Sequence, residues 1–294
     1  MSEPNGSPWI VEADAASPAE CVARPVSWES LHALPPDPML LQAVSRADAL
    51  VDIGVLVAAA VLTLSVETGI YFLVAGNAGF PNLSTGGDNA PDPELVRAVI
   101  LPAMATRTVL LTAAVFIINR ARGLSLAALG VASRQLASNA GLGVLVIAAL
   151  SLLMLAGAVV VQLVFPGFAE QMQENTRRLK EMVPRMSPPA LLALMAMVAW
   201  WEELVFRGFL LTRVRRATGS WAWAVVVSGG VFVGLHALEQ TGAAMLFISL
   251  LALTFSLLTI WRRSLIPAIA GHLVFDVSQF ILLYYVHFPA SQAV

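Results

Sequence analysis

The chain has almost no cysteine, little charge and a single lysine. Its 294 residues include one cysteine, Cys21, which excludes an intramolecular disulfide and a cysteine-based metal site. Charged residues make up 12% of the chain, against about 25% in soluble domains. With 58% hydrophobic residues, a net charge of −2 and no basic run, the chain is not expected to bind nucleic acid. The composition predicts an all-α, polytopic membrane helix bundle.

Signatures of several protease and carrier classes are also missing. The sequence contains no HExxH metalloprotease motif and no GxSxG nucleophile elbow. Gly87 and Asp88 are adjacent, but they fall in a predicted loop rather than inside a helix. No internal repeat is visible, which counts against a transporter built from two related halves.

Seven apolar segments are long enough to cross a bilayer core of about 30 Å, which requires roughly 20 helical residues. They cover residues 49–75, 96–119, 141–165, 189–211, 221–240, 242–261 and 265–287. Residues 1–46 are rich in proline and lack an apolar run, so we expect a disordered cytoplasmic tail rather than a signal peptide. Residues 47–294 then form the membrane domain. Within it, residues 168–186 suit either a short amphipathic helix or a solvated linker.

Basic residues are distributed unequally between the two ends of these segments. Ten arginines fall on the side of the N-terminus: Arg24, Arg46, Arg120, Arg122, Arg134, Arg213, Arg215, Arg216, Arg262 and Arg263. The loop between the third and fourth segments carries four basic residues on the other side: Arg177, Arg178, Lys180 and Arg185. The positive-inside rule therefore predicts a cytoplasmic N-terminus. We expect a multi-pass protein of a bacterial plasma membrane.

Two adjacent glutamates lie in the fourth segment, where a charge such as Asp or Arg costs roughly 2.5–3.5 kcal/mol at the centre of a membrane helix. Glu203 precedes Arg207 by four residues, the spacing of a helical ion pair. Glu202 lies about 140° away from Arg207 around an α-helix, so it should face a different surface. We therefore predict that Glu203 and Arg207 are structural and that Glu202 is catalytic, with the reversed roles as the alternative.

Histidines follow in two later segments. His236 comes four residues after Phe232 in the fifth segment, and His272 precedes Asp276 by four residues on one face of the seventh. Each has a purely structural alternative, since a membrane histidine often bonds a neighbouring helix and a His–Asp pair can stabilise its own helix. Nearby glycines could allow close helix packing. These are Gly208, Gly234 and Gly271.

Together these groups suit hydrolysis. Glu202, His236 and His272 could hold a zinc ion, or the glutamate could activate water without a metal while a histidine or a protonated acid stabilises the oxyanion. We predict that the three side chains face one central or conical polar cavity. Counting residues from the cytoplasmic ends indicates that this cavity opens at the arginine-rich end.

The three segments resemble the CPBP family, which includes CAAX prenyl protease 2 and Abi-type proteins, over about residues 189–287. The family pattern EExxxR, FxxxH and HxxxN or HxxxD reads here as Glu202 to Arg207, Phe232 to His236 and His272 to Asp276. The resemblance implies an intramembrane endopeptidase in which the first glutamate activates water, both histidines complete the site and the last residue supports the transition state. Eukaryotic relatives have asparagine where this chain has Asp276.

The resemblance also implies the partners. Eukaryotic relatives cleave the C-terminal tripeptide of prenylated proteins, so a membrane-embedded, prenylated or leader peptide is the expected substrate, within a lipid bilayer. Some relatives act as scaffolds or in bacteriocin immunity, which leaves a non-catalytic membrane protein as the alternative. A transporter that uses Glu202, Glu203 and the histidines as a proton relay is a third possibility.

Overall fold

The computed structural model describes residues 44–75, 93–131 and 135–285. These residues form helices and include no β-strand. The predicted tail lies outside the described residues except for Val44, Ser45 and Arg46, and most of the loop after the first segment also lies outside them.

The helices follow the predicted apolar segments closely. In chain order they are α3 (Arg46–Ala75), α4 (Pro93–Ala121), the 3-10 turn η2 (Leu126–Leu129), α5 (Leu136–Val164), α6 (Phe168–Met182), α7 (Pro188–Glu203), the π-helix η3 (Leu204–Leu210), α8 (Leu211–Thr218), α9 (Trp221–His236), α10 (Gly242–Arg262) and α11 (Ile266–Tyr285). Among the described residues, six spans are long and apolar enough to cross a membrane, and α9 is a shorter apolar helix of 16 residues. The polytopic helical fold is confirmed.

Two of the boundary differences have local causes. The fourth segment continues without interruption through η3 and α8 to Thr218, where Gly219 ends it in a left-handed conformation. The fifth segment ends at His236, four residues earlier than predicted, because residues 237–240 form the turn that leads into α10. His236 therefore sits at the end of its helix.

Residues 168–182 form the amphipathic helix α6, so the linker alternative is wrong. One side of α6 carries acids and arginines in i,i+3 and i,i+4 pairs, such as Glu174 with Arg178 at 2.8 Å. Hydrogen bonds from Arg177 and Arg178 lower the pKa of Glu174 to about 2. The opposite side contributes Phe168 and Asn175 to the protein interior, against α10 and α5.

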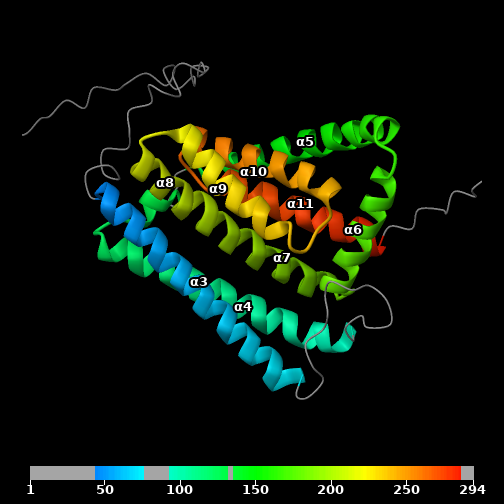
Figure 1. Cartoon of the computed structure of the whole chain (residues 1–294), viewed down its shortest axis with the longest axis horizontal. Helices are drawn as coiled ribbons and strands as arrows, with labels where there is room; N and C mark the ends of the chain where they lie inside the picture. Colours follow the sequence, from blue (N-terminus) through cyan, green and yellow to red (C-terminus); the bar gives the residue numbers. More distant parts are fainter. Residues whose placement is uncertain (1–43, 76–92, 132–134, 286–294) are drawn as a thin grey trace, which may run out of the picture. The chain divides into compact units, whose positions relative to one another are not determined.

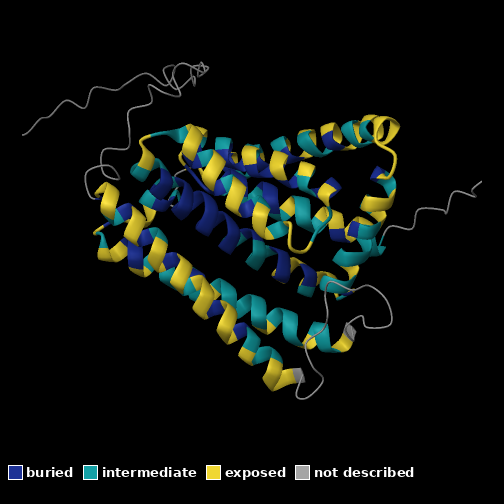
Figure 2. Cartoon of the chain, viewed as in Figure 1, coloured by how far each residue is buried: buried dark blue, intermediate teal, exposed yellow. Residues whose placement is uncertain are grey.

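The continuous helix α7–η3–α8 lies in the middle of the bundle. It contacts α4 and α11 along α7 and contacts α3 and α9 along α8, as Figure 1 shows. The most apolar window of this span is 56% buried, compared with 6–44% for the other five spans. Figure 2 shows it as the darkest helix of the bundle. The two glutamates and Arg207 therefore occupy the protein core rather than the lipid face.

Two of the three predicted glycine contacts are present. A Cβ on Gly208 would lie 3.2 Å from the carbonyl oxygen of Leu129, and a Cβ on Gly271 would lie 3.1 Å from that of Gly143. Gly234 was predicted to allow a similar approach, but nothing lies within 4 Å of its ideal Cβ position. The missing contact reflects the exposure of that face of α9.

Charged residues outside the motifs tie helices together. Arg107 Nε donates to Glu67 at 2.8 Å, which links α3 and α4. Asp52 accepts from Arg122 at 2.8 Å and from Arg213 at 3.2 Å. Asp52 is only 2% exposed, because both arginines cover it.

Candidate active site

The predicted ion pair of the fourth segment is present in the core. Arg207 Nη1 donates to Glu203 Oε1 at 3.0 Å, and neither side chain is exposed to solvent. The pair spans the change from α7 to the π-helix η3, which the sequence did not predict. Short π-helical segments occur frequently at functional sites.

Aromatic rings enclose the rest of the Arg207 side chain. Its guanidinium carbon lies 4.3 Å from the centre of the Phe232 ring and 5.8 Å from that of Phe255. A cation over aromatic faces gains roughly 2 kcal/mol or more when it is shielded from water. The Phe232 ring also stacks obliquely on His236 at 4.4 Å. The phenylalanine of the FxxxH pattern therefore connects the first motif to the second.

Glu203 has a second partner that the sequence did not indicate. His272 Nδ1 lies 2.8 Å from Glu203 Oε1. A carboxylate can only accept, so Nδ1 carries the proton and donates, which leaves Nε2 directed away from Glu203. Stacking of the imidazole on Phe255, with 5.5 Å between ring centres, holds the same orientation.

Glu202 approaches the other edge of the same imidazole. Its Oε2 atom lies 3.7 Å from His272 Nε2, and Asp276 Oδ2 lies 3.4 Å from the same nitrogen. The prediction that Glu202 and Glu203 face different surfaces is therefore only partly right, since both reach one histidine. Helical angles give the directions in which the two glutamates leave the backbone of α7. They do not prevent both side chains from contacting one imidazole ring on the neighbouring helix α11.

The second histidine is oriented by its own helix. His236 Nδ1 lies 2.9 Å from the carbonyl oxygen of Phe232, four residues earlier. A carbonyl can only accept, so Nδ1 donates and Nε2 is the nitrogen left for other partners. Both histidines of the site therefore present Nε2.

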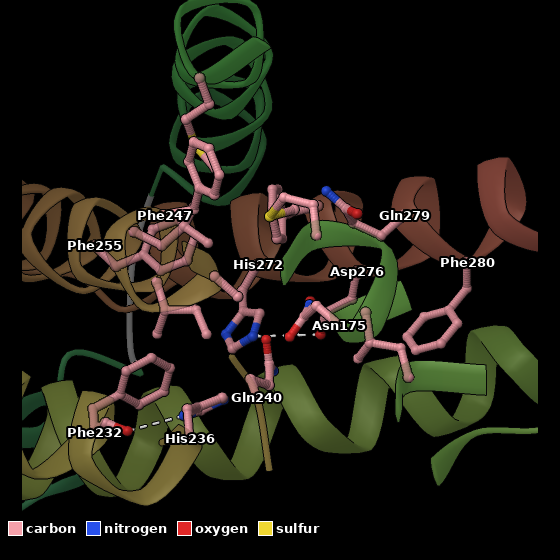
Figure 3. A pocket seen from close by; sticks show the side chains of 17 residues that line it. Asn175, Phe232, His236, Gln240, Phe247, Phe255, His272, Asp276, Gln279 and Phe280 are labelled. Atoms are coloured by element: carbon pink, nitrogen blue, oxygen red, sulfur yellow. Dashed lines mark hydrogen bonds and ion pairs between the residues drawn. The ribbon is translucent and has the colours of Figure 1, made fainter. Parts of the chain in front are cut away.

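One cavity of about 150 Å³ brings most of the predicted groups together (Figure 3). His236 and His272 line it, as predicted, and Asp276 lines it as well. Its other walls come mainly from α6, α10 and α11 and are largely apolar: Met154, Met172, Asn175, Leu179, Phe232, Gln240, Ala244, Phe247, Ile248, Leu251, Phe255, Phe275, Gln279 and Phe280. Glu202 was predicted to face this cavity but is not one of its lining residues. It is 7% exposed and directed toward His272, where α7 packs against α11.

The cavity lies at the opposite end of the bundle from the one predicted. Its lining includes residues of α6, the turn after α9 and the beginning of α10. The arginine-rich segments are at the other ends of these helices, before Trp221 and after Arg262. The prediction counted residues from the helix ends to estimate the depth of Glu202 and His272. That count gave no position for α6, which supplies one wall of the cavity.

Zinc binding by Glu202, His236 and His272 stays a prediction. Within the described residues, no group of three or more His, Cys, Asp or Glu side chains could hold a metal ion. Glu203 is bonded to Nδ1 of His272, so Nε2, which Glu202 and Asp276 approach, is the ring nitrogen that could still bind a metal.

Sequence reasoning missed three amide side chains in the cavity wall: Asn175, Gln240 and Gln279. The amphipathic pattern of residues 168–186 was the available signal for Asn175, because it placed one face of a helix against the bundle. Nothing in the spacing of Gln240 or Gln279 distinguished them from other polar residues.

A comparison with known protein families matches one part of the chain. Residues 184–278 match the family model for type II CAAX prenyl endopeptidase Rce1-like proteins. The matched region begins before α7 and ends within α11, so it contains all three motifs and excludes α3 to α6. No curated protein and no solved structure matches the chain.

Proposed function

We propose that this integral membrane protein is an endopeptidase in which Glu202 activates the attacking water, because residues 184–278 match the family model for type II CAAX prenyl endopeptidase Rce1-like proteins. Glu203 and Arg207 hold His272 in position, and His236 and Asp276 complete the site. The carboxylate–imidazole arrangement around His272 is the observation that carries this proposal.

The two glutamates differ in what remains for them to bind. Glu203 Oε1 is occupied by Arg207 and His272. Oε2 of each glutamate is fully buried and has no hydrogen-bond partner, but Glu202, unlike Glu203, accepts no hydrogen bond at either oxygen among the described residues. A buried polar atom without a partner costs about 1–3 kcal/mol, more when it is charged, so such an atom calls for an explanation. A carboxylate oxygen that is free to accept a proton is what a general base requires.

The reaction then follows from the available atoms. Glu202 accepts a proton from water while the water oxygen bonds to the scissile carbonyl carbon, which gives a tetrahedral oxyanion. The carbon–nitrogen bond breaks as Glu202 returns the proton to the leaving nitrogen. Nε2 of His272 and Nε2 of His236 are the imidazole atoms available to the water and the substrate. Asp276 can donate a hydrogen bond only in its protonated form.

The cavity limits the substrate. Its walls are mostly apolar, with aromatic rings such as Phe247 and Phe275. An apolar cavity of similar volume can accommodate benzene. We propose that it takes one apolar side chain of a membrane-associated or lipidated peptide, and that a prenyl chain would lie outside it, along the lipid-facing helices.

Replacement of Glu202 by glutamine tests the proposal. With a farnesylated fluorogenic peptide, Glu202→Gln should lose about 10²–10⁴-fold in turnover, the range expected for a general base, with little change in melting temperature. Glu67→Gln is the matched control, since Glu67 is also 7% exposed but pairs with Arg107 away from the cavity. It should lose stability and keep turnover per folded molecule.

Other outcomes distinguish the alternatives. A wild-type chain that hydrolyses no peptide but binds partner proteins would support the scaffold or immunity role, and uptake into proteoliposomes would support transport. A zinc content near one per chain, with activity lost on chelation and restored by zinc, would replace the metal-free proposal.

The orientation in the membrane is also a proposal. The structure adds Arg97 to the basic residues at the α6 end, since its Nε donates to the Arg185 carbonyl at 2.8 Å. Ten basic residues still oppose five, which favours a cytoplasmic arginine-rich end. The cavity would then open on the non-cytoplasmic side of, we expect, a bacterial plasma membrane.

Cysteine labelling on intact cells tests this orientation. In a Cys21→Ala background, an impermeant maleimide should label Gln279→Cys at the cavity and should not label Arg120→Cys at the other end. The reverse pattern would show a cavity that opens to the cytoplasm.

A further inference from the structure

Asn175 of α6 occupies a wall of the cavity, outside the residues that match the family model. Its side chain is buried, at 5% exposure, and Figure 3 shows it among the polar groups of the cavity. His236, His272 and Asp276 line the same cavity. A polar side chain from a helix beyond the three motifs therefore shares the candidate active site.

Hydrogen bonds fix which end of the Asn175 amide faces the cavity. The backbone N–H of Thr241 donates to Asn175 Oδ1 at 3.0 Å. An N–H group cannot accept, so the atom next to it must be the amide oxygen, and Nδ2 must point elsewhere. The turn between α9 and α10 thus holds the amide in one orientation.

The amide nitrogen remains free to donate. Within the part of the chain that the structure describes, Nδ2 has no hydrogen-bond partner, and it is not one of the fully buried atoms without a partner. It is therefore partly exposed, on a side chain that lines the cavity. An amide nitrogen offers two N–H donors.

The other amides of the cavity are held less firmly. Gln279 is exposed, and Gln240 is half-buried on the turn after α9. A donor that is already buried and oriented loses less conformational freedom on binding a ligand. Asn175 is therefore the most preorganised of the amide donors in the cavity. Asp276, which also lines the cavity, is an acid and has no amide donor.

We propose that Asn175 is a substrate-binding residue whose Nδ2 donates to a backbone carbonyl of the bound peptide. This role rests on the proposed peptidase function. It extends the site to α6, so a helix that precedes the family-matched residues contributes to substrate recognition as well as to structure.

Three variants separate this role from a structural one. Asn175→Asp keeps an oxygen for the Thr241 N–H but removes the two N–H donors. Asn175→Ala removes the oxygen and the two donors and adds no charge. Gln171→Ala is the matched control, because Gln171 Oε1 accepts from the Ala243 N–H at the start of α10 at 3.0 Å and Gln171 does not line the cavity.

Both Asn175 variants should lower kcat/KM for the farnesylated peptide about tenfold or more, within the range for a lost hydrogen bond to a buried group. Gln171→Ala should stay within about twofold, although its melting temperature should fall as far as that of Asn175→Ala. In a Glu202→Gln background, Asn175→Asp should weaken binding of the same labelled peptide by a similar factor.

Each contrary result has a definite meaning. Unchanged kcat/KM in either Asn175 variant, or an equal loss in Gln171→Ala, would overturn the role of Asn175 and leave the peptidase proposal intact. A wild-type chain with neither turnover nor peptide binding would overturn the peptidase proposal, and the role of Asn175 with it.

Discussion

Glu203 should be essential for two reasons that a pair of variants can separate. Its Oε1 atom accepts from Arg207 at 3.0 Å and from His272 at 2.8 Å, and the Glu203 and Arg207 side chains are fully buried. Glu203→Gln removes the negative charge and leaves the Arg207 cation unpaired in the core. Breaking a buried pair costs about 3–5 kcal/mol. At roughly 2–4 °C per kcal/mol, the melting temperature should fall by about 6–20 °C.

The double variant Glu203→Gln with Arg207→Met tests both parts. Arg207→Met removes the unpaired cation and places a thioether against Phe232 and Phe255, a favourable contact. Melting temperature should therefore recover toward the wild-type value. Activity should remain low, because His272 Nδ1 no longer has a carboxylate to orient the ring.

Melting temperature is measured on detergent-solubilised protein, and turnover is measured per folded molecule. A double variant that regains full turnover would refute the role of Glu203 in orienting His272. A Glu203→Gln protein that is stable but inactive, together with an unstable Glu202→Gln protein, would show that the two glutamates have the reverse roles.

Two further predictions concern packing and pH. Gly271→Ala should destabilise the protein by about 1–3 kcal/mol, since the new Cβ would lie 3.1 Å from a backbone oxygen of α5. Gly234→Ala is the control, because its new Cβ meets open space and the change should be neutral or stabilising. Equal melting temperatures for the two variants would refute the close packing at Gly271. The Glu174 pKa of about 2 lies below its ordinary 4.5, so its ion pairs should persist above pH 4.5 and be lost as the pH falls toward 2. A carboxyl titration by NMR with a midpoint near 4.5 would show that these pairs do not form in solution.

Local spacing in the sequence determined much of this protein. The apolar segments gave the helices, because a bilayer core fixes their length and composition. The i,i+4 spacings of Glu203 with Arg207 and of His272 with Asp276 gave contacts within single helices, which helical geometry alone brings together. The four-residue spacing of Phe232 and His236 likewise brings their rings into contact within α9.

Contacts between helices depended on the tertiary structure. Glu203 meets His272 across 69 residues of sequence, and Asn175 meets the turn after α9 across 66. Such pairs form only when packing sets the relative position and rotation of whole helices, which no periodicity within one helix specifies. For the same reason, the position of the cavity beside α6 and the burial of Glu202 behind His272 were decided by how α6, α7 and α11 pack against one another.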